Sequence, residues 1–168
     1  MAKKSKAAST PATAALEAAD ITYVAHSYTH SDSAQSYGAE AAAQLGVDAR
    51  RVFKTLMVST GARASEELAV AIVPVDSTLD LKSVAAVLGA KKAQMADKDA
   101  AQRRSGYVLG GISPFGQRQI SPTVIDASAG QFETIFISGG RRGFSLQLAA
   151  DDAVKILNAL VAPIANYR

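Results

Sequence analysis

The feature that most limits how this chain can fold is the segment from Gly110 to Gly116, which reads Gly-Gly-Ile-Ser-Pro-Phe-Gly. Glycine lets the backbone turn at positive φ and leaves no Cβ in the way of a neighbour, while proline fixes φ and removes one N–H donor. Such a segment predicts a loop between two apolar segments. Two interpretations fit it equally: a tight connection, or a loop that directs backbone N–H groups at a bound oxygen atom.

Two other stretches are expected to meet this loop in the folded chain. One is the segment 138–143, with the sequence Ser-Gly-Gly-Arg-Arg-Gly, which ends a predicted strand. The other is Lys54, which lies inside a predicted apolar strand from Val52 to Ser59. Alternate residues of a strand share a face, so Lys54 shares its face with three aliphatic side chains. A lysine there either extends to the sheet edge or meets a specific partner, and the pattern allows both.

Hydrophobic periodicity and capping residues predict helices and strands along most of the chain. Helices are predicted from Pro11 to Ala19, Tyr37 to Leu45, Leu81 to Leu88, Asp97 to Gly106 and Asp151 to Leu160, with Leu160 completing the last apolar stripe. Strands are predicted from Ile21 to Tyr28, Val52 to Ser59, Leu68 to Val75, Lys91 to Met95, Thr123 to Asp126, Phe132 to Ser138 and Phe144 to Leu148.

The order of these elements predicts the fold class. Strands and helices are intermixed without the regular spacing of β-α-β units, and several strands are joined as hairpins. This pattern predicts one α+β domain over residues 9–168, with a mixed, mostly antiparallel sheet or partial barrel surrounded by helices. Residues 1–8 contain lysine, alanine and serine without periodicity, and are predicted to form a mobile basic tail.

The residue types exclude several kinds of site. The 168 residues include no cysteine and only two histidines. The missing cysteines exclude a disulfide framework, a thiolate zinc site and a cysteine nucleophile. The sequence also offers no evident Ser-His-Asp set and too few ligands for a metal, so we predict no metal and no cofactor.

Charge and hydropathy limit the partners and the location. The 18 basic and 15 acidic residues give a formal net charge of +3, which permits an anionic partner such as RNA without requiring one. No apolar run is long enough to span a membrane, and the basic N-terminal residues are not followed by the apolar region of a signal peptide. We therefore expect a cytoplasmic protein without membrane contact.

Several separated motifs resemble, in the same order, those of the YbaK/EbsC-type aminoacyl-tRNA deacylases. Within that family the chain is most similar to the bacterial Cys-tRNA(Pro) deacylase group. The similarity covers nearly the whole chain after residue 8. The matching stretches are 26–30 (His-Ser-Tyr-Thr-His), 52–56 (Val-Phe-Lys-Thr-Leu), 79–82 (Leu-Asp-Leu-Lys), 88–92 (Leu-Gly-Ala-Lys-Lys), 95–97 (Met-Ala-Asp), 101–103 (Ala-Gln-Arg), 106–117 (Gly-Tyr-Val-Leu-Gly-Gly-Ile-Ser-Pro-Phe-Gly-Gln) and 138–143.

The resemblance implies an editing enzyme that removes a wrong amino acid from tRNA. For this subgroup the implied substrate is cysteine mischarged on tRNA(Pro) by prolyl-tRNA synthetase. Cysteine and proline have similar volumes, so a binding pocket alone separates them poorly. The expected partners are the mischarged tRNA(Pro) and prolyl-tRNA synthetase, which would select the tRNA, and the expected state is a monomer or weak dimer.

The resemblance also assigns roles to residues. Its conserved features are a strand lysine, here Lys54, and a Gly-x-x-x-Pro loop, here Gly110 to Pro114. The implied catalytic residues are Lys54, Gly110, Gly111, Ile112 and Ser113, with loop amides stabilising the oxyanion. The implied substrate-binding residues are Tyr28, Tyr37, Pro114, Ser138, Gly139 and Gly140, and the implied tRNA-binding residues are Arg141 and Arg142.

The implied mechanism needs no nucleophile from the enzyme. The thiolate of the substrate attacks its own ester carbonyl, releasing tRNA and a cysteine thiolactone. One position departs from the family pattern, because relatives often carry an acidic residue where this chain has Ser145. Two alternatives stay open: a water-mediated deacylase for another small amino acid, such as alanine on tRNA(Pro), or a non-catalytic module that binds tRNA or the synthetase.

Overall fold

The computed structural model describes residues 9–30 and 37–167. The predicted tail, residues 1–8, lies outside the described residues. The described helices are α1 (Pro11–Ala18), α2 (Tyr37–Leu45), α3 (Leu81–Val87), α4 (Lys98–Ser105) and α5 (Ala150–Leu157). The described strands are β1 (Tyr23–Ser27), β2 (Val52–Ser59), β3 (Leu68–Pro74), β4 (Thr78–Leu79), β5 (Gln94–Met95), β6 (Thr123–Asp126), β7 (Thr134–Arg141), β8 (Phe144–Ala149), β9 (Leu160–Ala162) and β10 (Ala165–Asn166).

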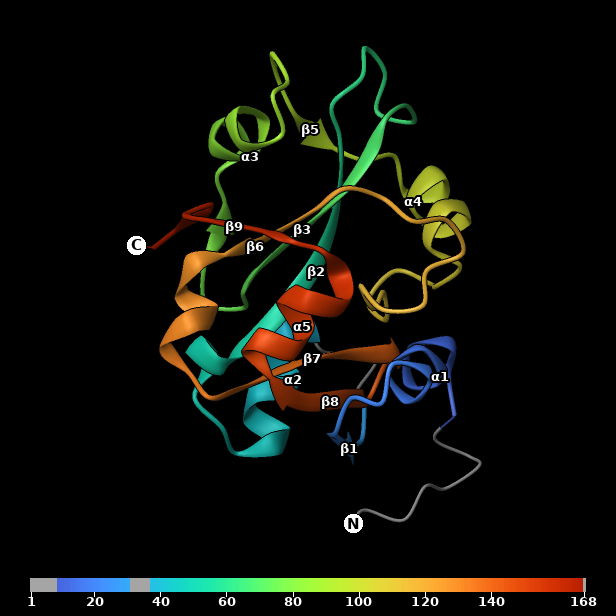
Figure 1. Cartoon of the computed structure of the whole chain (residues 1–168), viewed down its shortest axis with the longest axis vertical. Helices are drawn as coiled ribbons and strands as arrows, with labels where there is room; N and C mark the ends of the chain where they lie inside the picture. Colours follow the sequence, from blue (N-terminus) through green and yellow to red (C-terminus); the bar gives the residue numbers. More distant parts are fainter. Residues whose placement is uncertain (1–8, 31–36, 168) are drawn as a thin grey trace.

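Eight of these strands form one mixed sheet in the order β1-β8-β7-β2-β3-β6-β9, with β5 paired to β2 (Figure 1). The β1–β8, β7–β8, β2–β3 and β2–β5 pairs are antiparallel, whereas β2–β7, β3–β6 and β6–β9 are parallel. Helices pack around the sheet, which confirms the predicted α+β class and the single domain.

Strand β2 joins the two halves of the sheet. It pairs with β3 from Phe53 to Ser59, but with β7 only at Val52 and Phe53. Beyond Phe53 the two strands separate, so that the side of β2 at Lys54 and Leu56 has no strand partner from β7. Figure 1 shows β2 rising from the level of β7 and β8 toward the upper end of the molecule.

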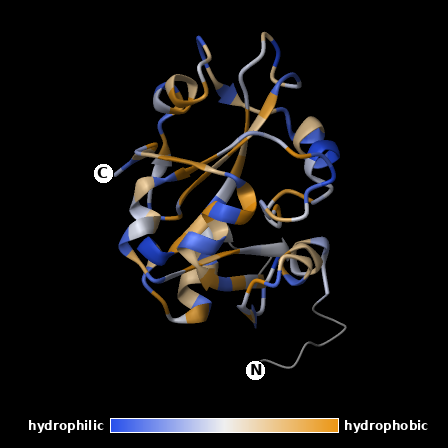
Figure 2. Ribbon diagram, viewed as in Figure 1, coloured by the Kyte–Doolittle hydropathy of each residue, from blue (hydrophilic) through white to orange (hydrophobic). Residues whose placement is uncertain are grey.

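The two faces of the sheet bury different sets of helices. The largest core packs α1, α4 and α5 against one face, and includes Phe53 and Met57 from β2. On the other face, α3 packs over Val58, and α2 packs over Val52. Figure 2 shows the most hydrophobic residues in the central strands. Lys54 therefore lies between two apolar clusters on the face that the sequence predicts for it.

Local signals place most elements within a residue or two of their predicted bounds. Thr10 forms a capping box at the start of α1, and Asp97 caps α4. The prediction for Leu160 was wrong. Asn158 adopts a left-handed conformation with φ of 48° and ends α5. Leu160 then lies in β9, where it pairs with Val124 of β6. The spacing of Leu160 fits a helical stripe, but periodicity alone cannot detect the turn at Asn158.

The buried carboxylate of Asp126 connects the last segment of the chain to β6. It is 4% exposed, and its Oδ1 accepts hydrogen bonds from the N–H of Ile164 at 2.9 Å and of Ala165 at 3.1 Å. Its Oδ2 accepts a third bond from the N–H of Ser128 at 3.1 Å. One side chain thus fixes both the turn after β6 and the turn between β9 and β10.

The Asp126→Ala variant is expected to lose about 3 kcal/mol of unfolding free energy, because three backbone N–H groups lose a charged acceptor. Urea denaturation followed by circular dichroism measures this loss. Asp126→Asn keeps one oxygen acceptor and serves as the matched control, with a smaller expected loss. A loss for Asp126→Ala below about 1 kcal/mol would show that these three bonds do not hold the C-terminal segment.

Candidate active site

A cavity of about 360 Å³ opens where β2 separates from β7. Residues from all three stretches that were expected to meet take part in its wall. From the predicted site residues these are Tyr28, Lys54, Gly110, Ile112, Ser138 and Arg141. The convergence of the strand lysine, the glycine-rich loop and the segment 138–143 is therefore present in the structure.

Lys54 contributes a cationic side chain to the part of the cavity wall that β2 forms. Its Nζ donates a hydrogen bond to the backbone oxygen of Ser77 at 2.6 Å, and the side chain is half-buried. Burial lowers the pKa of the Lys54 ammonium from its ordinary value, and the carboxylate of Asp76 partly opposes this change. The arrangement holds a partly desolvated cation at the wall, where it can attract a negatively charged group of a ligand.

The glycine-rich loop is folded on itself before it reaches the cavity. Gly110 adopts φ of 86°, and the N–H of Gly111 donates to the backbone oxygen of Val108 at 2.9 Å. The Gly111 amide is therefore occupied, although the sequence suggested it as an oxyanion donor. Gly110 and Ile112 line the cavity, and their backbone N–H groups have no hydrogen-bond partner within residues 9–30 and 37–167.

Ser113 and Pro114, within the loop, are fully or nearly buried and lie outside the cavity lining. The Oγ of Ser113 accepts a hydrogen bond from the N–H of Phe115 at 3.2 Å, and its backbone oxygen accepts one from Gln117 at 3.0 Å. The hydroxyl of Tyr107 closes the base of the loop by donating to the Phe115 oxygen at 2.7 Å. These contacts give Ser113 a structural role in shaping the loop.

The two glycines after Ser138 are needed for packing rather than for contact with the cavity. A Cβ on Gly139 would clash with the ring of Phe144, and one on Gly140 would lie 2.7 Å from the ring of Tyr107. Neither glycine lines the cavity, although both were expected to. Ser138 does line it, and its Oγ accepts a hydrogen bond from the N–H of Gly140 at 3.2 Å.

The two arginines of this segment are placed differently. Arg141 lines the cavity, and its guanidinium lies 4.6 Å from the centre of the Phe144 ring. Arg142 donates through Nε and Nη2 to the backbone oxygen of Leu109, at 3.0 and 2.7 Å. Arg142 therefore connects the β7–β8 turn to the glycine-rich loop, whereas Arg141 is positioned to meet a ligand.

Tyr28 and Ser145 complete the polar part of the wall. Burial, together with the carboxylate of Glu40, raises the pKa of the Tyr28 phenol, which therefore stays protonated at neutral pH. Ser145 is 3% exposed, and its Oγ donates to the backbone oxygen of Ile137 at 3.4 Å. The side chain of Tyr37 lies outside the described part of the chain.

Sequence reasoning missed several wall residues. The apolar wall includes Leu56, Val75, Leu109 and Phe144, and Thr55 lines the cavity beside Lys54. The Oγ1 of Thr55 is buried and has no hydrogen-bond partner among the described residues. Period-two alternation assigns Thr55 to the face opposite Lys54. Thr55 and Lys54 line the same cavity because β2 has no β7 partner beyond Phe53. The sequence alone does not reveal where this pairing ends.

Within residues 9–30 and 37–167, no group of three histidine, aspartate or glutamate residues is placed to hold a metal ion. No helix in the same ranges is both long enough and apolar enough to cross a membrane.

Comparison with known proteins places this chain among the enzymes that edit aminoacyl-tRNA. Residues 32–156 match the model of the aminoacyl-tRNA editing domain family. The chain is also 33% identical over 165 residues to EbsC of Enterococcus faecalis, a candidate Cys-tRNA(Pro)/Cys-tRNA(Cys) deacylase, and the match covers 98% of both chains. The chain belongs to the aminoacyl-tRNA editing domain family, and it is a deacylase.

Solved structures show the same fold. The crystal structure of a candidate trans-editing enzyme for prolyl-tRNA synthetase matches with a TM-score of 0.79 and 19% identity, covering 98% of this chain and 99% of the other. The crystal structure of a hypothetical protein matches with a TM-score of 0.81 and 22% identity, covering 94% of this chain and all of the other.

Proposed function

We propose that this chain removes cysteine from Cys-tRNA(Pro). The observation that carries the proposal is the cavity in which Lys54, Gly110, Ile112 and Ser138 meet. The relative EbsC is named for the same substrate, together with Cys-tRNA(Cys). The cavity volume of about 360 Å³ suits an amino acid and part of the terminal ribose.

The proposed reaction uses the thiolate of the substrate as its nucleophile. The substrate thiolate attacks the ester carbonyl, a carbon–sulfur bond forms, and the carbon–oxygen bond to the ribose breaks. The ribose oxygen takes a proton and leaves with the tRNA, while cysteine thiolactone is released and later hydrolysed by water. The protein needs no nucleophile of its own for this route, and the chain contains no cysteine.

Two backbone N–H groups and one ammonium group of the protein stabilise the charges that develop during the reaction. The N–H groups of Gly110 and Ile112 are the donors for the oxyanion, since both residues line the cavity and the N–H of Gly111 is already bonded to Val108. The ammonium of Lys54 favours the thiolate form of the substrate and attracts the terminal phosphate. The hydroxyl of Ser145 takes the place of the acid that relatives often carry, so contact with the substrate amine there is uncharged.

Comparing three esters of the same tRNA tests the proposal. Cysteine, serine and alanine are each attached to tRNA(Pro), and the rates of release are measured with the released amino-acid product identified. Serine matches cysteine in shape but its hydroxyl stays protonated at neutral pH, so it is the control for the thiol. The cysteine ester is expected to react at least about 100-fold faster, because only its side chain ionises near neutral pH to give an intramolecular nucleophile.

The product identifies the nucleophile. Thiolactone as the first product supports attack by the substrate thiol. Equal release of alanine, with free amino acid as the first product, would instead indicate a water-mediated deacylase. Binding of all three tRNAs without release would indicate a non-catalytic binding module.

Selection of tRNA(Pro) is assigned to prolyl-tRNA synthetase. Its presence should raise the rate of deacylation for Cys-tRNA(Pro) relative to other tRNAs that carry cysteine.

A further inference from the structure

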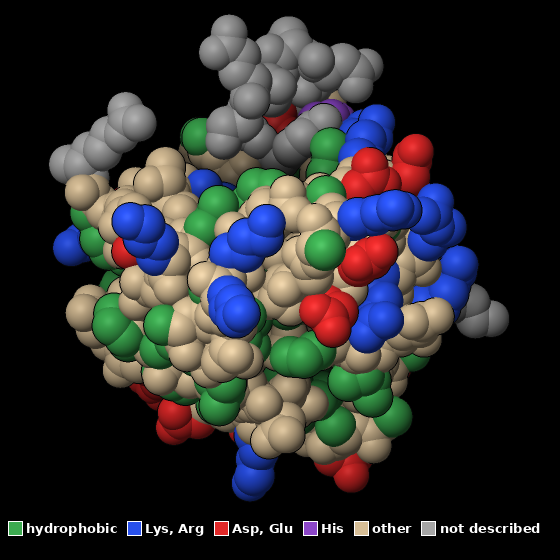
Figure 3. Space-filling view, turned by 90° about the horizontal axis from the view of Figure 1, so that it is seen from above, with side chains coloured by type: hydrophobic (Ala, Val, Ile, Leu, Met, Phe, Trp, Pro, Cys, Tyr) green, Lys and Arg blue, Asp and Glu red, His purple; other side chains and the backbone are tan. Residues whose placement is uncertain are grey.

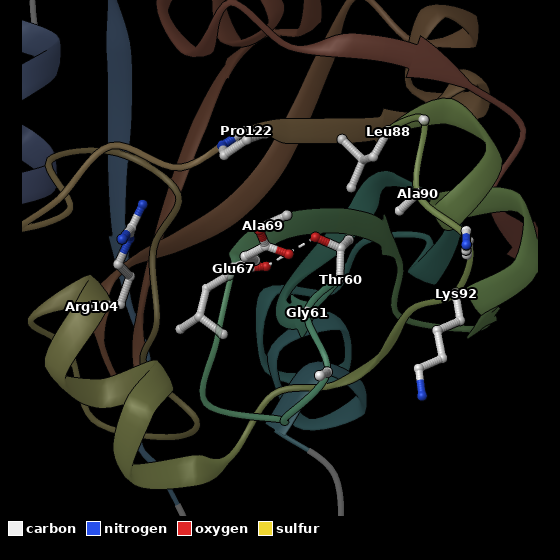
Figure 4. A pocket seen from close by; sticks show the side chains of 13 residues that line it. Thr60, Gly61, Glu67, Ala69, Leu88, Ala90, Lys92, Arg104 and Pro122 are labelled. Carbon is white, nitrogen blue, oxygen red and sulfur yellow. Dashed lines mark hydrogen bonds between the residues drawn. The ribbon is translucent and has the colours of Figure 1, made fainter.

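A second concave surface lies at the far end of β2, away from the cavity that contains Lys54. This groove of about 640 Å³ lies between three parts of the chain: the β2–β3 connection at Thr60, the turn after α3 at Lys91 and Lys92, and the pair formed by Arg104 of α4 and Pro122 before β6 (Figure 4). Figure 1 places the β2–β3 connection and the turn after α3 at the upper end of the molecule.

The groove presents positive charge to its surroundings. Three basic side chains and one acidic side chain, that of Glu67, line it. Lys91 and Lys92 are exposed, and neither takes part in an ion pair within the described ranges. Arg104 is fixed in the wall, with its Nε donating to the Oγ of Ser121 at 2.8 Å. Figure 3 views this end from above and shows basic side chains spread across the face, with acidic ones mainly toward one side.

Internal hydrogen bonds hold the walls of the groove in place. Thr60 donates through its N–H and its Oγ1 to the backbone oxygen of Glu67, at 3.0 and 3.2 Å (Figure 4). Arg104 donates a second bond through Nη2 to the oxygen of Ile120 at 2.9 Å. The groove is therefore formed before any ligand arrives, and only the two lysine side chains must be ordered on binding.

The groove and the catalytic cavity lie at different points along the β2–β3 pair. Lys54, which lines the cavity, pairs with Val73, and four positions further along β2 Val58 pairs with Ala69, which lines the groove. Thr60 follows Lys54 by six positions, which corresponds to about 20 Å in the strand direction. A few nucleotides of single-stranded RNA can span this distance from an aminoacylated 3′ end in the cavity.

We propose that the groove binds the phosphate backbone of the substrate tRNA, beyond the 3′-terminal nucleotide held near Lys54. The inference rests on the proposed function for the orientation of the tRNA. Lys91 and Lys92 provide the unpaired cations that neutralise phosphates, and such contacts position a nucleic acid without reading its sequence. This assigns the lysine pair after α3 to tRNA binding and not to the chemical step.

The test compares Lys91→Gln/Lys92→Gln with the control Lys98→Gln/Lys155→Gln, which removes two exposed lysines from α4 and α5. Binding of uncharged tRNA(Pro) is measured over a range of salt concentrations. Deacylation is measured with whole Cys-tRNA(Pro) and with cysteinyl-adenosine, which is too short to reach the groove. The groove variant is expected to bind tRNA about tenfold more weakly and to lower the slope of log K against log salt by about 2.

The same variant is expected to deacylate cysteinyl-adenosine at the wild-type rate, and the control variant to behave as wild type throughout. Unchanged tRNA binding by the groove variant would overturn the proposal. Binding of a polyglutamate peptide gives a second test. If peptide binding depended on Lys91 and Lys92 while tRNA binding did not, the proposal would also be overturned, because the groove would then recognise an acidic protein segment. Lysine-dependent tRNA binding without any deacylation would support the groove and refute the proposed function separately.

Discussion

The Lys54→Ala variant is expected to lose at least about 100-fold in kcat/KM for Cys-tRNA(Pro), because removal of even one preorganised donor that stabilises developing charge costs about 10²–10³ in rate. Lys54 is the lysine that lines the cavity between β2 and the glycine-rich loop, and it is held there by the oxygen of Ser77. Single-turnover deacylation measures the loss. Lys155→Ala, an exposed lysine on α5, is the matched control and should react at the wild-type rate.

The pH dependence separates a charge role from a packing role for Lys54. The rate should rise as the substrate thiol ionises and fall again as the ammonium of Lys54 loses its proton. Because burial lowers the pKa of Lys54, the falling limb should lie below the ordinary lysine value of about 10.4. Lys54→Met keeps the length of the side chain without its charge, and wild-type activity for Lys54→Met would refute the charge role.

The Gly111→Ala variant is expected to lose about 100-fold in rate, since a displacement of about 1 Å at a catalytic loop costs that much. A Cβ at this position would lie 2.8 Å from the Cα of Arg141 and 2.9 Å from its carbonyl carbon. Both atoms belong to the backbone of the β7–β8 turn, so no side-chain rotation relieves the contact. The loop must move away from the turn and carry the N–H groups of Gly110 and Ile112 with it.

The matched control for this loop substitution is Gly130→Ala. Gly130 has no positive φ, and nothing lies within 4 Å of an added Cβ. Its expected activity and thermal stability are those of the wild type. If Gly111→Ala were as active as Gly130→Ala, close contact between the loop and the turn would not be needed to place the oxyanion donors.

The position of Lys54 on its face could be predicted from the sequence because strand geometry is local. Alternation placed the lysine among Val52, Leu56 and Val58, and in the structure it lies between the apolar clusters of α2 and α3. The order of strands across the sheet was not predictable from the sequence in this way. Pairing of β2 with β7, and its end after Phe53, depends on contacts between residues far apart in the chain.

The glycines show a second limit of sequence reasoning. Composition indicates where the backbone is free to turn, but not what each glycine is for. Gly110 supplies a positive φ at the cavity, whereas Gly139 leaves room for the ring of Phe144, and the amide of Gly111 is used inside the loop. These roles differ because of which atoms approach each residue, and those atoms come from other segments. The loop was therefore found from the sequence, and the function of its individual residues was not.

The outermost strands of the sheet, β1 and β9, come from opposite ends of the described chain. During synthesis the strands from β2 to β8 emerge before β9, so β6 has an open edge until Leu160 to Ala162 arrive. An unpaired edge with apolar residues such as Val124 and Ile125 is a template for pairing with another chain. Pairing of Leu160–Ala162 with β6 thus closes that edge, and a chain that lacks this strand is expected to leave Val124 to Asp126 open to pairing with another chain.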